Sequence, residues 1–308
     1  MAFVPVVGSV NYKGGVGKTT SSRVAAQGFA EDISINQGKP VLIVDLDPQA
    51  NTTRRWQLAA VSHEDGSVIP IPHDELAEAT DGLSYSSVCD LWLDLLGAGS
   101  PVAPLAYPTS NPRIHVVPAH ENFMVAASRM PDEKVPVLAA RMVEWLRDPS
   151  LAEKYCCVII DTQPTKSALI DAALAACTHV YIPFIPEPQP VDGVLSMITY
   201  VSRQAQNRGN DVPLRFLGLL PNRVEKNVIL HKKTLRSLED HPNFGRYLMP
   251  VRMEKRIGYA ETDDYRNAPD QVTDLEGSNI EWEARRFVRY LWEQIKADLP
   301  ALGHEVGA

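Results

Sequence analysis

A glycine-rich stretch at residues 11–20, with the sequence NYKGGVGKTT, holds the side chains best suited to chemistry. It follows an apolar run and comes before a helical pattern. Glycines let backbone N–H groups approach phosphate oxygens without a Cβ clash, and the first turn of a helix offers further N–H groups to an anion. Lys18 can place its charge at the β- and γ-phosphates, and the Thr19 hydroxyl can ligate Mg²⁺. The pattern therefore predicts a nucleotide-phosphate site, formed by Lys13, Gly14, Gly15, Val16, Gly17, Lys18, Thr19 and Thr20.

Carboxylates end two further apolar runs. The run VLIVDLDPQAN contains Asp45 and Asp47, and the run VIIDTQP contains Asp161. The carboxyl ends of parallel strands form the sheet edge at which ligands bind. A carboxylate at that edge can hold a nucleotide-bound metal, usually through a water. We therefore expect Thr19, Asp45 and Asp161 around Mg²⁺, while a loop-supporting or turn-forming role for Asp45 stays open.

Short β-branched runs alternate with helical patterns along the chain, which is typical of α/β proteins. The expected fold is a mostly parallel twisted sheet with helices on both faces. The expected strands are residues 4–10, 41–45, 114–117, 156–161, 179–184 and 214–220. The expected helices are residues 18–30, 135–146, 191–201 and an apolar stripe from 284 to 299. Turn formers at about 57–86 indicate a surface insertion, followed by a short helix at 86–96. Because no linker separates two patterned halves, we expect one domain over residues 1–308.

Composition and charge narrow the class of protein. With 44% hydrophobic and 22% charged residues, the chain resembles an ordinary globular protein. It begins with no leader pattern and has no apolar run of the ~20 residues that span a membrane, so we expect a cytoplasmic protein. The four cysteines lack metal-ligand spacing. The net charge of −8 argues against nucleic-acid binding, but residues 221–260 hold nine Lys or Arg against four acids.

The glycine stretch departs from the general phosphate-loop pattern, because Tyr12 occupies the position of its first glycine. It matches instead the pattern K-G-G-x-G-K-[ST], with Lys13 as a second lysine, and so resembles the ParA/MinD family of deviant-Walker P-loop ATPases. This resemblance implies a single P-loop ATPase domain that binds ATP and Mg²⁺. It implies that Lys13 reaches across a homodimer to the partner's nucleotide, where a cation neutralises charge as the γ-phosphoryl departs. It also implies catalytic roles for Lys18 and for Asp47, which would position the attacking water. Gln163 departs from the family's D-x-P-P pattern.

Further roles are implied by looser matches in the C-terminal half. Two residues lie where the family contacts the base: Asn222 in the segment LLPNR and Pro250 in the segment MPVR. The alternative for both is an ordinary turn residue with no contact to the base. The family binds DNA without sequence preference through basic residues in this half. The candidate DNA-contacting residues are Lys232, Lys233, Arg236 and Arg246. The alternative is that these residues only form a solvated helix face.

The resemblance implies a partition ATPase that positions DNA or other cargo. Mg-ATP would drive dimerisation and DNA binding on the nucleoid, and a ParB-like adaptor would stimulate hydrolysis and release. The alternative is a membrane-associated positioning ATPase like MinD, but the tail at 300–308 has no Lys or Arg for an amphipathic anchor. A relative of the nitrogenase iron protein is excluded, since Cys177 follows Asp161 by sixteen residues. The first expected strand begins by about residue 4, so we expect no N-terminal helix-turn-helix.

Overall fold

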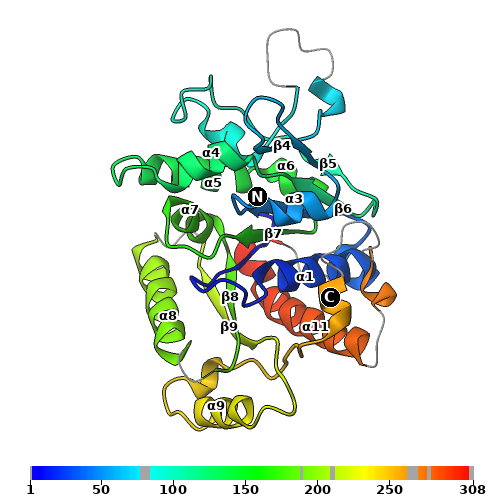
Figure 1. The fold of residues 1–308 in the computed structure, drawn as a ribbon, viewed down its shortest axis with the longest axis vertical. Helices are drawn as coiled ribbons and strands as arrows, with labels where there is room; N and C mark the ends of the chain where they lie inside the picture. The colour runs from blue at the N-terminus through cyan, green and yellow to red at the C-terminus, as the bar shows by residue number, and fades with distance from the viewer. Residues whose placement is uncertain are drawn as a thin grey trace.

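A seven-stranded sheet with the order β5–β6–β2–β7–β1–β8–β9 forms the centre of the computed structural model (Figure 1). All neighbouring strands are parallel except β5 and β6, which are antiparallel. The structure describes residues 2–76, 84–187, 190–208, 212–261, 270–275 and 279–304. The strands of this sheet are β1 (Val6–Ser9), β2 (Val41–Leu46), β5 (Tyr107–Pro108), β6 (Ile114–Val117), β7 (Cys157–Thr162), β8 (His179–Phe184) and β9 (Arg215–Pro221).

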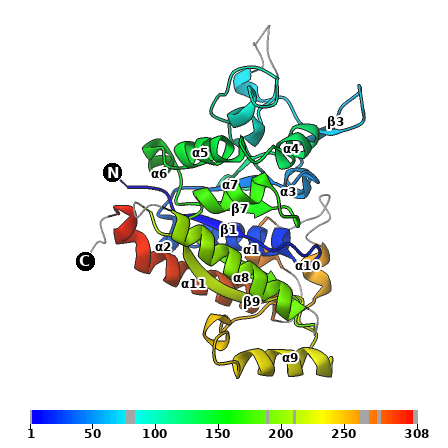
Figure 2. The same cartoon turned by 90° about the vertical axis from the view of Figure 1, so that its left-hand side faces the viewer.

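Helices cover both faces of the sheet (Figures 1 and 2). They are α1 (Lys18–Glu31), α2 (Ile33–Asn36), α3 (Asn51–Arg55), α4 (Glu121–Ser128), α5 (Val135–Leu146), α6 (Pro149–Lys154), α7 (Ala168–Ala176), α8 (Pro190–Asn207), α9 (Ile229–Glu239), α10 (Ile257–Glu261) and α11 (Ile280–Asp298). Short 3₁₀ turns are η1 (Asp74–Leu76), η2 (Val88–Trp92), η3 (Gly245–Tyr247), η4 (Val272–Asp274) and η5 (Leu299–Leu302). Within the described residues, no helix combines the length and apolar character that crossing a membrane requires.

Two hydrophobic cores lie on opposite sides of the sheet because successive strand residues point to opposite faces. In β2, Leu42 and Val44 join the core that includes residues of α5, α7 and α8. Val41 and Ile43 join the core that includes residues of α1 and α11. With both faces covered, β1, β2, β7 and β8 are buried at every position, as expected for a parallel sheet.

Helices α1 and α11 approach each other closely at a glycine. A Cβ atom added to Gly28 of α1 would lie 2.3 Å from the Val288 Cγ2 atom of α11. This approach fixes α1, and with it the glycine-rich loop that leads into α1, against the C-terminal helix.

The sheet and its helices confirm the predicted fold class. The expected strands 114–117 and 179–184 coincide with β6 and β8, the helix 135–146 coincides with α5, and the helix 191–201 lies within the longer α8. The short helix expected at 86–96 is wrong in type and length. Within this segment the structure has only the 3₁₀ turn η2, which follows its capping residue Ser87.

The irregular segment expected at 57–86 contains a small sheet of its own. Its strands β3 (Ala59–Val61) and β4 (Val68–Pro70) are antiparallel. The Val68 N–H donates to Glu121 Oε2 at 2.8 Å, which ties this sheet to the start of α4. Residues 77–83 of the expected insertion lie outside the described residues.

Candidate nucleotide-binding site

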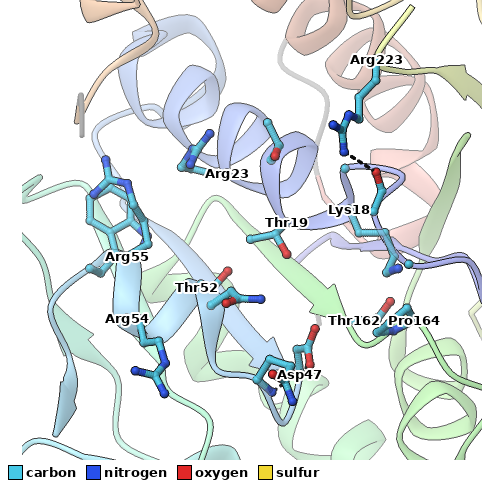
Figure 3. A pocket seen from close by; sticks show the side chains of 17 residues that line it. Lys18, Thr19, Arg23, Asp47, Thr52, Arg54, Arg55, Thr162, Pro164 and Arg223 are labelled. Atoms are coloured by element: carbon cyan, nitrogen blue, oxygen red, sulfur yellow. Dashed lines mark hydrogen bonds between the residues drawn. The ribbon is translucent and has the colours of Figure 1, made fainter. Parts of the chain in front are cut away.

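The glycine-rich loop connects the end of β1 to the start of α1 at the carboxyl edge of the sheet. Gly15 and Gly17 have φ angles of 71° and 85°, a left-handed conformation that favours glycine. Such turns arrange backbone N–H groups into an anion-binding nest. The loop lines a hollow of about 480 Å³, into which Lys18, Thr19 and Asp47 also project (Figure 3).

Lys18 is almost fully buried at the floor of this hollow, with 6% of its surface exposed. Its Nζ donates to the Lys13 carbonyl oxygen at 3.2 Å. Burial lowers the pKa of Lys18, and the nearby carboxylates of Asp161 and Asp47 oppose that shift. A desolvated ammonium held in this way is ready to pair with a phosphate.

Asp161 lies beside this hollow, next to the lining residues Thr52 and Thr162. It lies at the end of β7, in register with Ser9 of β1, and is fully buried. Its Oδ2 accepts from the Thr52 hydroxyl at 2.8 Å, whereas Oδ1 has no hydrogen-bond partner among the described residues. Burial raises the pKa of Asp161, and the hydrogen bond from Thr52 opposes that shift.

These groups fit a magnesium ion. In the described part of the chain, no group of three or more His, Cys, Asp or Glu side chains could hold a metal by itself. Mg²⁺ in nucleotide sites is usually held by one or two carboxylates together with substrate phosphates and waters. The Asp161 Oδ1 atom and the Thr19 hydroxyl match that donor set.

Asp45 supports the loop after β2. Its Oδ2 accepts from the Thr53 N–H at 2.9 Å and from the Thr53 hydroxyl at 2.7 Å. Its Oδ1 accepts from the Asp47 N–H at 3.1 Å. The sequence left several roles open for Asp45, and these hydrogen bonds correspond to loop support. Metal ligation by Asp45 stays a prediction.

Asp47 faces the glycine-rich loop from the loop between β2 and α3. Its Oδ1 accepts from the Gln49 N–H at 2.9 Å, which orients the carboxylate. Burial raises the pKa of Asp47, against the Gln49 hydrogen bond and the charge of Lys18. The position suits a residue that orients a water beside a bound phosphate.

Lys13 does not line the hollow. Its Nζ pairs with Glu187 Oε2 at 2.9 Å, and both side chains are 47% exposed. Glu187 follows β8, so this ion pair joins the glycine-rich loop to a neighbouring strand of the sheet. The cross-dimer role of Lys13 stays a prediction.

The two residues expected at the base lie in different hollows. Asn222 lines a hollow of about 400 Å³ beside Gly17, where a base could lie next to the phosphate loop. Pro250 lines another hollow of about 670 Å³, and its carbonyl oxygen accepts from Arg286 Nη2 at 3.3 Å. The structure does not bring Pro250 to the glycine-rich loop, so its base contact has no support from this geometry.

The expected DNA-contacting residues are exposed at one end of the molecule. Helix α9 lies at that end (Figure 2). Lys232, Lys233 and Arg236 are exposed on it, whereas Leu235 is buried. Arg246 follows in η3, where its guanidinium lies 4.7 Å from the centre of the Tyr247 ring. Lys232, Lys233 and Arg236 are called the α9 cations below.

Sequence reasoning missed several residues of the site. The hollow is also lined by Arg23, Thr52, Arg54, Arg55, Trp56, Thr162, Pro164 and Arg223. Arg223 and Glu187 gave no signal, because their partners Gly15 and Lys13 lie 208 and 174 residues away. Thr52 was easier to identify from the sequence, since it directly follows the run VLIVDLDPQAN.

The fold, the glycine-rich loop between β1 and α1, and the acidic ends of β2 and β7 define a P-loop protein of the deviant Walker A class. A family model described as an AAA domain matches residues 4–213. Over 264 residues, the chain is 26% identical to the chromosome-partitioning ATPase Soj of Thermus thermophilus, with 86% of each chain covered. The chain belongs to this AAA-domain family and is a ParA-type partition ATPase by relationship.

Solved structures with a similar fold extend over nearly the whole chain. A variant of McdA from Cyanothece in complex with ATP superposes with a TM-score of 0.66 at 16% identity and covers 100% of both chains. Cobyrinic acid a,c-diamide synthase of Mycobacterium smegmatis, with an ATP analogue and magnesium, gives a TM-score of 0.62 at 23% identity and covers 96% of both chains. At these identities the likeness shows the fold alone.

Proposed function

We propose that the chain is an ATP-driven DNA-positioning ATPase that forms a homodimer around Mg-ATP. The observation that carries this proposal is the buried, unsatisfied Asp161 Oδ1 atom beside Lys18 and Thr19 at the glycine-rich loop. Family membership supports nucleotide hydrolysis in general. Structural neighbours with ATP, or with an ATP analogue and magnesium, support these ligands.

Each group at the loop would have a distinct task in nucleotide binding. The N–H groups of residues 14–19 would bind the phosphate oxygens, and Lys18 would neutralise their charge. Thr19 and Asp161 would hold Mg²⁺, which supplies further neutralisation of the β- and γ-phosphates. Asp47, oriented by Gln49, would position water for attack on the γ-phosphoryl group.

Dimerisation would change the partner of Lys13. In the single chain, Lys13 pairs with the exposed carboxylate of Glu187. In the dimer, it would leave that carboxylate and neutralise the partner's triphosphate, as a trans cation does in other phosphoryl transfer reactions. Loss of the γ-phosphoryl group would remove charge from this interaction, so the dimer would separate after hydrolysis.

The α9 cations and Arg246 would bind DNA phosphates when two subunits present them together. Lys and Arg contacts to phosphates release counterions, so such binding weakens steeply with salt and does not depend on sequence. Doubling the surface by dimerisation raises affinity through effective concentration. Such a protein would act in the cytoplasm on the nucleoid, with a ParB-like adaptor accelerating hydrolysis.

The experiment that tests this function compares the pure protein in Mg-ADP and in a non-hydrolysable Mg-ATP analogue. We expect a monomer that binds DNA weakly in ADP and a dimer that binds it strongly in the ATP state, with affinity falling as salt rises. Equal DNA binding in both states would falsify the proposal. Binding to anionic lipid vesicles instead of DNA in the ATP state would favour a membrane-positioning ATPase.

A further inference from the structure

Two consecutive side chains after β9 hold three consecutive carbonyl groups of the phosphate loop. Asn222 Nδ2 donates to the carbonyl oxygens of Val16, at 2.9 Å, and Gly17, at 3.3 Å. Arg223 Nη1 donates to the carbonyl oxygen of Gly15 at 2.8 Å (Figure 3). One two-residue segment, more than 200 residues away in sequence, thus holds the centre of the loop from outside.

Holding these carbonyl groups affects the N–H groups that would bind phosphate. A peptide unit is planar and trans, so its N–H and C=O groups point in opposite directions. Fixing the carbonyls on the outer side of the loop therefore fixes the direction of the N–H groups within the same peptide planes. A loop that is ordered before its ligand arrives loses less conformational freedom on binding.

The segment is packed tightly against the loop. A Cβ atom added to Gly17 would lie only 2.3 Å from Asn222 Nδ2. Asn222 is 3% exposed, and its Oδ1 accepts from the Arg223 N–H at 2.8 Å, so both ends of its amide group are engaged. Arg223 has a φ of 51°, a left-handed conformation that costs free energy in a residue other than glycine. The surrounding hydrogen bonds maintain this conformation.

We propose that Asn222 and Arg223 act as a positioning clamp that orders the phosphate loop for binding any nucleoside triphosphate. The proposal rests on the proposed function in that it concerns the same nucleotide site. It assigns the Asn222 amide group to the loop rather than to recognition of the base. It also gives a role to Arg223, which lines both the phosphate hollow and the neighbouring hollow beside Gly17.

A base-free ligand separates the clamp from base recognition. We would measure the affinities of the wild-type protein and the Asn222→Ala variant for Mg-ATP, Mg-GTP and inorganic tripolyphosphate with Mg²⁺. Loss of a loop-holding hydrogen bond should weaken all three by a similar factor, about fivefold. A loss confined to ATP, with tripolyphosphate binding unchanged, would overturn the clamp and restore the base-reading role.

Hydrogen exchange of the ligand-free protein tests the role of Arg223. In the Arg223→Ala variant, the amides of residues 14–18 should exchange faster than in the wild type, and Arg223→Lys, which keeps a donor, should restore part of the protection. The control is Arg129→Ala, which removes the same charge at the exposed end of α4. It should change neither the exchange of these amides nor the affinity for nucleotide. Weaker nucleotide binding by Arg223→Ala without faster exchange would show direct phosphate binding instead of a clamp.

The two proposals can fail separately. If the wild-type protein bound none of the three ligands, the proposed nucleotide function would be wrong, while the exchange rates would still report on the clamp. If the wild type bound ATP and both variants matched it in affinity and exchange, the clamp would be wrong and the function would stand. Thermal melting of each variant is the control that checks whether its fold is intact.

Discussion

Replacing Glu187 with Gln should strengthen the ATP-bound dimer. In the single chain, the Lys13 ammonium lies 2.9 Å from Glu187 Oε2, and this ion pair lowers the pKa of Glu187. If Lys13 must leave Glu187 to reach the partner's nucleotide, the ion pair opposes dimerisation. Glu187→Gln removes that opposition and leaves Lys13 in place.

The magnitude follows from the exposure of the pair. Both side chains are 47% exposed, so the pair contributes the ~0.2–1 kcal/mol of a surface salt bridge. A dimer breaks two such pairs, so the gain is about 0.4–2 kcal/mol. This corresponds to a dimer dissociation constant lowered by about 2- to 30-fold. The gain should be greatest at low ionic strength, because salt screens the wild-type pair.

Sedimentation equilibrium with a non-hydrolysable Mg-ATP analogue measures this constant. Glu281→Gln is the matched control, since Glu281 pairs with Arg285 at 2.8 Å at similar exposure on α11. It loses the same charge without releasing Lys13. The effect of Glu187→Gln should also vanish in a Lys13→Ala background. A weaker or unchanged dimer in Glu187→Gln would refute the competition between the carboxylate and the partner's phosphates.

Four other changes test separate parts of the site. Lys18→Ala should abolish detectable Mg-ATP binding in calorimetry, because it leaves the triphosphate without its buried cation; retention of near wild-type affinity would contradict the assignment. Asp47→Ala should bind ATP yet accumulate as a DNA-bound dimer, seen by size-exclusion chromatography, and a monomeric variant in ATP would count against its role in hydrolysis. Neutralising the α9 cations together should reduce the slope of log affinity for DNA against log salt by about 0.9 for each DNA phosphate that the variant no longer neutralises, whereas an unchanged slope would exclude them. Gly28→Ala should destabilise the fold by about 1–2 kcal/mol in denaturant titration, because overpacking against Val288 outweighs the better helix propensity.

The sequence predicts best those features that depend on neighbouring residues. The buried strands and the helix α5 have strong local periodicity, and two strands and that helix begin and end where expected. The signal for the phosphate loop is also local, because its glycines, Lys18 and Thr19 lie within a few residues of one another. The deviant lysine pattern then indicates the family, which the matched family model confirms.

Contacts that form only in the folded chain explain what the sequence could not predict. Asp45 has the position of a metal ligand in a linear pattern, yet both its oxygens accept hydrogen bonds from Thr53 and Asp47 once α3 forms. The sequence does not indicate a hydrogen-bond partner for the Asn222 amide group. Only the fold shows that the carbonyl oxygens of Val16 and Gly17 accept from it. The 3₁₀ turn in place of the helix expected at 86–96 is likewise bonded to other parts of the chain: the Val88 N–H donates to the Pro118 carbonyl oxygen and the Asp90 carbonyl oxygen accepts from the Val102 N–H, both at 3.0 Å.

The distribution of cations around the hollow gives a physical reason why a triphosphate should hold two subunits together better than a diphosphate. Within one chain, Lys18 is buried at the loop, whereas Lys13 lies outside the hollow in an exposed ion pair. A triphosphate carries more negative charge than a diphosphate, so it leaves more charge for a second ammonium to neutralise. The exposed pair is weak enough to be exchanged for a phosphate, whereas breaking a buried pair would cost far more free energy. An exposed partner for Lys13 therefore suits the reversible, nucleotide-dependent dimer proposed above, and replacing Glu187 changes the balance while Lys13 itself stays in place.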